Sequence, residues 1–330
     1  DGNPLIGPMP GVPNAFEACV FTFGICQAGG AGKVLAEWVT EGETEWDMWS
    51  CDPRRFTAFC DRNYCIAKGM EVYGHEYAIH FPHHAWPAGR DKKLSPIHDR
   101  LKAAGAQFGA YNGWERANWF ARPGDDTSEA ATQTFRREGA WFEAVREECL
   151  AVRDAAGLLD LPGFSRFNLE GAGGAEWLSR QITGAVPAPG RIGLAYFSDR
   201  KGRIVTEMSV VRHSESLMTL ITAAAAQWHD FELLQSRLPA DGSLQLTDET
   251  EDYSTLILCG PRSREILAAV CEADLTRPWL THQTSHIAGK YVNLIRVSFA
   301  GELGWEIHAA TADIPAVHTA VSEAGAPLGL

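Results

Sequence analysis

From residue 165 to residue 308, apolar and polar residues alternate in short runs that end at glycines or polar turns, and this pattern constrains the fold most. Such runs are typical of half-buried strands, because the side chains of a strand alternate between two faces. The expected strands are residues 165–170, 217–222 and 254–259, two strands within 192–212 that turn at 199–202, and a hairpin over 292–308 that turns at 301–304. Helical patterns lie between them, so the sequence predicts an α+β fold with mainly antiparallel sheets.

The expected helices carry apolar residues at spacings of three and four, which place these residues on one buried stripe. The first helix has Ala28, Ala31, Leu35 and Trp38 inward and ends at Gly42, and a short strand over residues 17–23 precedes it. The other helices are residues 142–156, stopped by Gly157; 175–182, running up to Gly184; 228–238; and a helix opened by 260–261 with residues 266, 270 and 271 inward.

Composition restricts the classes of function. The 330 residues include 29 Lys and Arg against 42 Asp and Glu, a formal net charge of −13. Such a surface repels phosphate backbones and anionic lipids, which argues against nucleic acid or a membrane as the main partner. The longest apolar stretch, around 217–228, contains polar residues and is too short to span a bilayer. Eight cysteines are few for a disulfide scaffold, so we expect reduced thiols, as in a bacterial cytoplasm or a mitochondrial matrix.

The character of the sequence changes along the chain and divides it into three parts. Residues 1–50 hold a Pro/Gly-rich turn, a strand and a helix, and residues 51–138 are dense in aromatics, histidines and prolines, which predicts an irregular connecting domain. Residues 139–330 carry the α+β pattern. Because the chain opens in mid-motif at Asp1 and stops directly after a helical pattern at Leu330, we expect a piece of a longer protein, truncated at both ends.

A glycine turn between the first strand and the first helix is one candidate binding site. Free amides and the helix dipole make a helix N-terminus a receptor for negative charge, such as a phosphate or the pyrimidine edge of a reduced flavin. The spacing is not Gly-x-Gly-x-x-Gly, and plain packing is the open alternative. The residues of this turn are Phe21, Thr22, Phe23, Gly24, Ile25 and Cys26.

A histidine cluster downstream is a candidate metal site. Four histidines lie at residues 75, 80, 83 and 84, with cysteines at residues 60 and 65 just upstream. Structural zinc sites show tight ligand pairs at each end, and this spacing fits none of the usual patterns. Hydrogen-bonded histidines are therefore the favoured interpretation, and no metal is expected.

Two acidic residues on predicted strands are the strongest candidates for chemistry. Alternation places Glu207 on one strand face and Met208 on the other, and a carboxylate on such a strand is costly unless it is paired, exposed or used. After the glycine-containing turn at 301–304, alternation places Glu306 and His308 on the face opposite Ile307. A carboxylate fixed on that face can accept two hydrogen bonds from an amino-pyrimidine edge. A solvated edge residue and a hairpin with solvated acids are the open alternatives.

Together, four separated blocks resemble one family in order and spacing: the FAD-dependent, tetrahydrofolate-linked demethylating flavoproteins, that is, dimethylglycine dehydrogenase, sarcosine dehydrogenase and their bacterial relatives. The first block, residues 1–8 with 23–32, resembles the C-terminal end of the FAD-dependent oxidoreductase domain. The second block, residues 49–55 with 113–120, resembles the connecting domain that follows it. The remaining blocks, from residue 141 through 170–171 and 258–261 to 301–306, resemble the folate-binding domain shared with the aminomethyltransferase of the glycine cleavage system.

The resemblance implies domains and residue roles. Residues 1–50 would close the FAD domain, 51–138 would connect, and 139–330 would form an incomplete folate-binding domain. Residues 21–26 would line FAD, which is mostly bound upstream of this chain. Glu207 would be catalytic, through electrostatic stabilisation of an iminium or acid/base work on the folate amine. Phe299 stands where relatives often have tyrosine. The folate-binding residues implied are Val205, Thr206, Glu207, Phe299, Glu306, Ile307 and His308.

The expected function is oxidative N-demethylation of a small methylated amine, such as dimethylglycine or sarcosine, on FAD, with the one-carbon unit passed to tetrahydrofolate as methylenetetrahydrofolate. The resemblance also makes an electron-transfer flavoprotein a candidate partner. Residues 1–330 alone would neither hold FAD nor oxidise an amine, because the family's residues for both lie upstream. The alternatives are a flavin-free tetrahydrofolate-dependent methyl or aminomethyl transferase, and a folate domain used only for binding or assembly.

Overall fold

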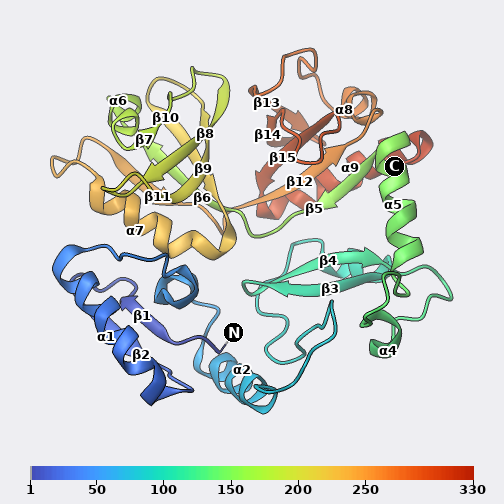
Figure 1. Cartoon of the computed structure of the whole chain (residues 1–330). Coiled ribbons are helices and arrows are strands. Elements are labelled where there is room, and N and C mark those ends of the chain that lie inside the picture. Colours follow the sequence, from blue (N-terminus) through green and yellow to red (C-terminus); the bar gives the residue numbers. More distant parts are fainter. Residues whose placement is uncertain (1) are drawn as a thin grey trace.

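The computed structural model describes residues 2–330, so Asp1, the first residue of the opening motif, lies outside the described residues. Two large antiparallel sheets lie side by side, and two small two-stranded sheets lie below them in the view of Figure 1. The predicted α+β class with mainly antiparallel sheets is confirmed. No helix within residues 2–330 combines the length and the apolar character needed to cross a membrane.

The N-terminal part is a small hairpin covered by one helix. β1 (Leu5–Pro8) pairs with β2 (Phe16–Cys19), and α1 (Gly24–Glu41) buries Ala31 and Val34 against them. The helix ends as expected at Gly42, whose φ of 74° is the left-handed conformation that glycine adopts without strain.

The strand expected over residues 17–23 ends early, at Cys19, and this part of the prediction was wrong. Val20 has a φ of 61°, a left-handed conformation that breaks a strand, and α1 begins already at Gly24. Ala28 was expected to face inward, but it is exposed together with most of the first two turns of α1, so the buried stripe begins at Ala31.

The connecting region holds more regular structure than its sequence suggested. Its main element is a hairpin in which Tyr111 pairs with Trp114 across Asn112 and Gly113. Both turn residues have positive φ, 49° and 84°, as a tight two-residue hairpin turn requires, and the Asn-Gly dipeptide is the sequence signal for it. The elements are η1 (Trp49–Cys51), η2 (Pro53–Arg55), α2 (Arg62–Gly74), α3 (His98–Ala103), β3 (Ala106–Tyr111), β4 (Trp114–Phe120) and α4 (Glu129–Thr132).

The first large sheet has the strand order β11-β6-β10-β9-β8-β7, and it buries Phe167, Met208 and Leu220 under α6 and α7. The strands expected over 165–170, 192–212 and 217–222 are confirmed. The helix expected over 175–182 ends at Ser179, because the residues at its end pair with β8 instead. The elements are β6 (Ser165–Glu170), α6 (Gly174–Ser179), β7 (Ile182–Thr183), β8 (Arg191–Ser198), β9 (Ile204–Arg212), β10 (Leu217–Thr222), η3 (Ala224–Ala226), α7 (Gln227–Arg237) and β11 (Gln245–Asp248).

The second large sheet has the order β13-β14-β15-β12-β5, with α8 and α9 over the core that holds Trp305 and Ile307. The 292–308 segment pairs as expected, but a loop over 296–303 replaces the tight turn. The helix expected over 142–156 stops at Asp154, and Gly157 begins a strand. The elements are α5 (Phe142–Asp154), β5 (Gly157–Asp160), β12 (Tyr253–Cys259), α8 (Ser263–Val270), β13 (His282–Ile287), β14 (Lys290–Ile295), β15 (Gly304–Ala310), η4 (Thr311–Asp313), α9 (Ile314–Gly325) and η5 (Ala326–Leu328).

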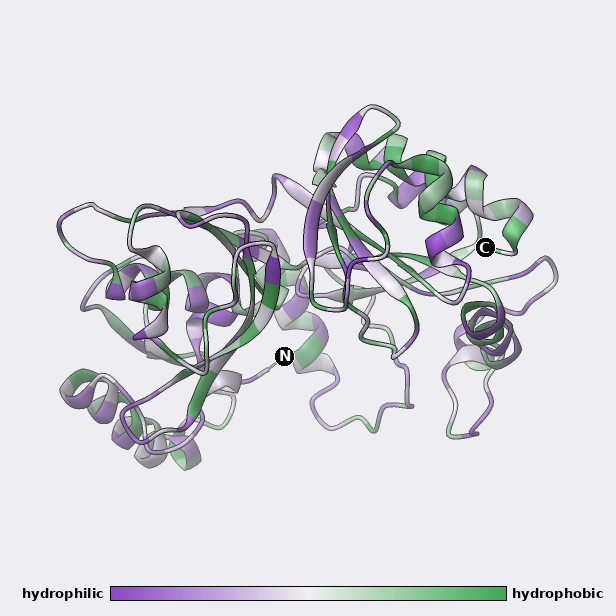
Figure 2. Cartoon of the chain, turned by 90° about the horizontal axis from the view of Figure 1, so that it is seen from above, coloured by the Kyte–Doolittle hydropathy of each residue, from purple (hydrophilic) through white to green (hydrophobic). Residues whose placement is uncertain are grey.

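Figure 2 shows that individual helices and strands of the chain carry both hydrophobic and hydrophilic residues, as expected for elements that bury one face and expose the other.

A buried acid lies where β5 meets the connecting region. Asp160 is 9% exposed, its Oδ1 has no hydrogen-bond partner, and the Ser95 hydroxyl is hydrogen-bonded to the carboxyl group. Burial raises the pKa of Asp160 to about 6, although Ser95, Arg116 and His98 act in the opposite direction. The folded protein therefore holds a proton on Asp160 more tightly than the unfolded chain does.

We expect the contribution of Asp160 to the free energy of unfolding to fall as the pH rises from 3.8 to about 6, because at this residue the folded state binds more protons than the unfolded state. Asp160→Asn removes this titration, so in urea unfolding the free energy of unfolding of the variant, relative to the wild type, should increase across this pH range by up to about 3 kcal/mol near neutral pH. The control Asp154→Asn, at the exposed end of α5, should keep the wild-type slope. Equal slopes in wild type and Asp160→Asn would contradict the expectation.

Candidate functional site

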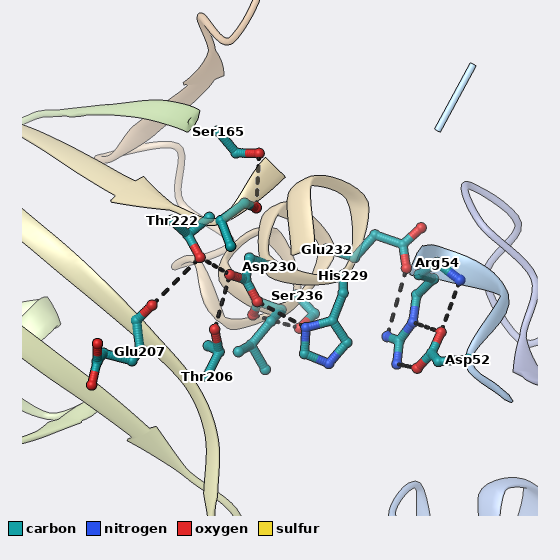
Figure 3. Close-up of polar contacts among 12 residues, drawn as sticks. Asp52, Arg54, Ser165, Thr206, Glu207, Thr222, His229, Asp230, Glu232 and Ser236 are labelled. Carbon is teal, nitrogen blue, oxygen red and sulfur yellow. Dashed lines mark hydrogen bonds and ion pairs between the residues drawn. The ribbon is translucent and has the colours of Figure 1, made fainter. Parts of the chain in front are cut away.

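Asp230 lies at the centre of a hydrogen-bond network that joins α7 to the first large sheet (Figure 3). Its side chain is fully buried. Thr206 Oγ1 on β9 donates to Asp230 Oδ2 at 2.9 Å, and Thr222 Oγ1 on β10 donates to the same oxygen at 2.6 Å. His229 Nδ1 lies 2.8 Å from Oδ1. Both carboxylate oxygens are thus engaged, and the network fixes α7 on the middle of the sheet.

The sequence analysis missed this network, although it predicted the helix. The available signal was the spacing of Asp230 and Leu234, which are four residues apart and therefore share the inward face of α7. An acid on the inward face of a helix requires donors from the elements packed against it. The hydroxyls of Thr206 and Thr222 meet this requirement, and only the strand pairing reveals that they are neighbours.

Glu207 lies on β9 opposite Tyr196 of β8, and its side chain is exposed. Its carboxylate points away from Asp230, while its main-chain oxygen lies 3.4 Å from Thr222 Oγ1 (Figure 3). Val205 on the same face is 37% exposed, so this end of the face is open rather than an apolar core. The charge of Glu207, followed by burial, raises the pKa of the Tyr196 phenol.

A pocket of about 450 Å³ lies between the N-terminal segment and the first large sheet. Trp38, Trp46 and Trp49 line it from one side. Thr206 and Asp230 line it from the other, so the buried network forms part of its wall.

Two arginines attach the N-terminal segment across this junction. Arg203, in the turn before β9, donates to the main-chain oxygens of Thr44, at 2.7 Å, and of Glu45, and it pairs with Asp199. Arg54 pairs with Asp52 at 2.6 Å and lies 3.8 Å from Glu232 of α7 (Figure 3). The pocket is thus bordered by charge-assisted contacts between segments far apart in the sequence.

Glu306 and His308 lie together on the face of β15 opposite the apolar core, as the alternation predicted. The Glu306 side chain is 20% exposed and that of His308 is 2% exposed. His308 Nε2 lies 2.9 Å from Glu306 Oε2, and His308 Nδ1 lies 3.1 Å from Thr255 Oγ1 on β12. Among residues 2–330, no donor is hydrogen-bonded to Glu306 Oε1.

Further polar side chains lie between the two large sheets. His213 Nε2 is hydrogen-bonded to Thr219 Oγ1 at 2.8 Å, and its ring meets that of His282 edge-on. His282 Nε2 lies 3.1 Å from Asn293 Oδ1. Burial, with the neighbouring His282 and Arg166, lowers the pKa of His213 to about 3, and burial also lowers the pKa of His282. These histidines are therefore neutral near neutral pH.

The other residues implied for folate lie in different surroundings. Phe299 lies in the loop before β15 and is fully exposed, next to a cavity of about 360 Å³ that Ser298 and Gly301 help to line. The Ile307 side chain is 0% exposed and packs in the core, on the face of β15 opposite Glu306. The structure brings Glu306 and His308 together, and among the described residues it records no contact between Glu207 and Glu306.

The residues expected to line a flavin lie around the first turn of α1. Ile25 is 97% exposed and Phe23 47% exposed, and residues 21–26 border neither of the two cavities described above. Phe21 alone packs on the small N-terminal core. Within the described chain this segment is an open surface rather than a pocket.

The histidine cluster is held by ring contacts. His80 stacks on His84 with ring centroids 4.7 Å apart, and both rings meet Trp86 edge-on. His84 Nδ1 lies 2.7 Å from Gln133 Oε1. Residues 2–330 contain no group of three or more His, Cys, Asp or Glu side chains placed to hold a metal ion.

Comparisons with known proteins divide the chain at residue 96. A family model described as "FAD dependent oxidoreductase central domain" matches residues 41–95, and one described as "GCVT N-terminal domain" matches residues 97–330. The aminomethyltransferase T of the glycine cleavage system from Bartonella henselae shares the fold, with a TM-score of 0.53 and 23% identity over 70% of this chain and 57% of that chain.

Two curated relatives match along almost the whole chain. Human mitochondrial dimethylglycine dehydrogenase is 30% identical over 332 residues, which are 99% of this chain and 38% of the relative. Mouse mitochondrial sarcosine dehydrogenase is 30% identical over 378 residues, covering 100% of this chain and 40% of the relative. The chain thus spans about two-fifths of the length of these relatives.

We expect Glu207→Gln to lower the pKa of Tyr196, because it removes the negative charge that disfavours the phenolate. The measurement is the titration of the Tyr196 ring carbon by NMR, assigned with Tyr196→Phe. The matched control Glu215→Gln, an exposed acid after β9, should leave this titration in place. An unchanged Tyr196 titration in Glu207→Gln would show that the two side chains do not interact.

Proposed function

Because the chain belongs to the GCVT N-terminal domain family, we propose that it is the folate-binding part of an FAD-dependent enzyme that oxidatively demethylates a small N-methylated amine. The resemblance to the dimethylglycine and sarcosine dehydrogenases is confirmed by matches along almost the whole chain. The proposed substrate is dimethylglycine, sarcosine or a similar amine, and the proposed acceptor of the carbon is tetrahydrofolate.

One observation carries the proposal. In one chain, residues 41–95 match an FAD-dependent oxidoreductase domain and residues 97–330 match a GCVT domain, and the GCVT domain presents the partly exposed carboxylate of Glu306. The first match supports hydride removal from an amine as the reaction class. The second supports a reduced folate as the receiver of the carbon that this reaction releases. The relatives that match along almost the whole chain are named dimethylglycine dehydrogenase and sarcosine dehydrogenase, which supports the same reaction class.

The residues on β15 fit the pterin ring of a folate. An amino-pyrimidine edge presents two neighbouring N–H donors, and a carboxylate is the side chain that accepts both with charge assistance. Glu306 has one oxygen held by His308 and the other without a protein donor among the described residues. We assign Glu306 to this edge, and Phe299 and Ile307, which are close to it in the sequence, are proposed to border the same ligand.

Glu207 is the proposed catalytic residue. Its carboxylate is exposed on β9, and Thr206, the residue before it, is fixed to Asp230. An exposed carboxylate on a fixed strand can stabilise a cationic iminium or exchange a proton with a folate nitrogen. Val205 and Thr206 are proposed to border the same ligand, Val205 with its partly exposed side chain.

FAD supplies the acceptor for the hydride when it is bound, and residues 21–26 do not form its pocket by themselves. Their proposed contact with FAD requires further protein on the other side of the flavin, because Ile25 and Phe23 are exposed. An electron-transfer flavoprotein as electron partner, and a bacterial cytoplasm or mitochondrial matrix as compartment, belong to the same proposal.

We expect the purified protein to bind 5-formyltetrahydrofolate, a stable reduced folate, and Glu306→Gln to weaken binding about 10-fold or more, because hydrogen bonds to a charged acceptor are lost. Isothermal titration calorimetry measures both affinities. The matched control Glu323→Gln, on an exposed position of α9, should bind like the wild type.

A visible absorption spectrum of the full-length protein separates the proposal from its rival, because residues 1–330 alone are not expected to hold FAD. A flavin band that bleaches when dimethylglycine or sarcosine is added supports the demethylating enzyme. A colourless protein that binds the folate through Glu306 supports a flavin-free methyl or aminomethyl transferase instead. Absence of both flavin and folate binding would overturn both functions.

A further inference from the structure

His308 is enclosed by protein on all sides. Its side chain is 2% exposed, and each ring nitrogen has one partner: Thr255 Oγ1 at 3.1 Å from Nδ1, and Glu306 Oε2 at 2.9 Å from Nε2. Thr255 and His308 are direct neighbours across β12 and β15, and Asn293 of β14 lies opposite His308 on the other side. The strand register therefore fixes the position of the ring.

The hydrogen bonds determine which ring nitrogen carries the proton. Burial lowers the pKa of His308, with Arg166 acting in the same direction, so the ring is neutral near neutral pH even though Glu306 acts to raise the value. A carboxylate only accepts, so Nε2 must donate to Glu306. Nδ1 is then bare, and the Thr255 hydroxyl donates to it. The chain of donors runs from Thr255 through His308 to Glu306.

We propose that Thr255 and His308 are positioning residues, which hold the Glu306 carboxylate in the orientation that receives the amino-pyrimidine edge of the folate. The inference rests on the proposed function. It also changes the role that the resemblance implied for His308, because a buried ring with both nitrogens engaged has no group left for the ligand.

Orientation matters because the terminal torsion of a free glutamate rotates over a broad range. Two neighbouring donors need both carboxylate oxygens in one plane, and ordering that plane during binding costs affinity. His308 holds Oε2 through one of its two lone-pair directions, which leaves the other direction and all of Oε1 for the ligand. The carboxylate is therefore ordered before the ligand arrives.

The first test is the tautomer of His308 in the wild-type protein, read from its ¹⁵N NMR shifts. The proposal requires a protonated Nε2 and a bare Nδ1. The opposite tautomer, or a ring that exchanges freely between the two, overturns the proposal without any substitution and without reference to folate.

The second test compares matched substitutions by calorimetry with 5-formyltetrahydrofolate. His308→Gln places an amide N–H near the position of Nε2 and should bind within about 3-fold of the wild type, whereas the shorter His308→Asn should lose about 10-fold. Thr255→Ser should bind like the wild type and Thr255→Val should bind more weakly. Thermal unfolding and circular dichroism establish that each variant is folded.

A double-mutant cycle separates positioning from general packing. Because His308 acts through Glu306, His308→Asn should have little further effect on binding in the Glu306→Gln background. Additive losses, or equal affinities of His308→Asn and His308→Gln, overturn the positioning role while folate binding itself stands. A wild-type protein that does not bind the folate overturns the proposed function, and with it this role, whatever tautomer is observed.

Discussion

The alternation of side chains along β15 is the constraint on which both the core and the site depend. This strand lies inside the second large sheet, so every second residue must be apolar: Trp305 and Ile307 bury their side chains under α8 and α9. The residues between them then face the first large sheet, where Glu306 and His308 meet polar neighbours. A slip of one residue would exchange the two sets, so the packing that stabilises the domain also fixes the carboxylate.

Three carboxylates show how surroundings separate structural acids from acids available to a ligand. Asp230 is fully buried with both oxygens engaged, so it joins elements and has no acceptor to spare. Asp160 is buried with an oxygen that has no partner, and its raised pKa relieves the cost by favouring the neutral form. Glu306 is partly exposed with one oxygen engaged, which orders it while leaving an acceptor within reach.

Sequence periodicity predicted the four strands β6, β8, β9 and β10 of the first large sheet, and the opposite facing of Glu306 and Ile307, because period-two patterns are local. It did not predict the two edge strands of that sheet, β7 and β11. It predicted less where an element depends on distant partners. β13 is largely polar and becomes a strand only by pairing with β14. The Asp230 network was missed for the same reason, since its donors come from strands that only the sheet order brings together. The β3–β4 hairpin, in contrast, could have been predicted from its Asn-Gly turn.

The junction between the N-terminal segment and the first large sheet links the two family matches physically. Arg203 lies in the turn before β9 and donates to main-chain oxygens of residues 44 and 45. Val205, the second residue of β9, is the first of the residues assigned to folate. A main-chain acceptor cannot be removed by substitution, so this contact constrains the path of the segment rather than its side chains. The strand that carries Glu207 is therefore held from both sides, by Arg203 at its start and by Asp230 under Thr206. The N-terminal segment is thus connected to β9 in two ways, directly through Arg203 and through α7, which Arg54 contacts at Glu232 and which carries Asp230.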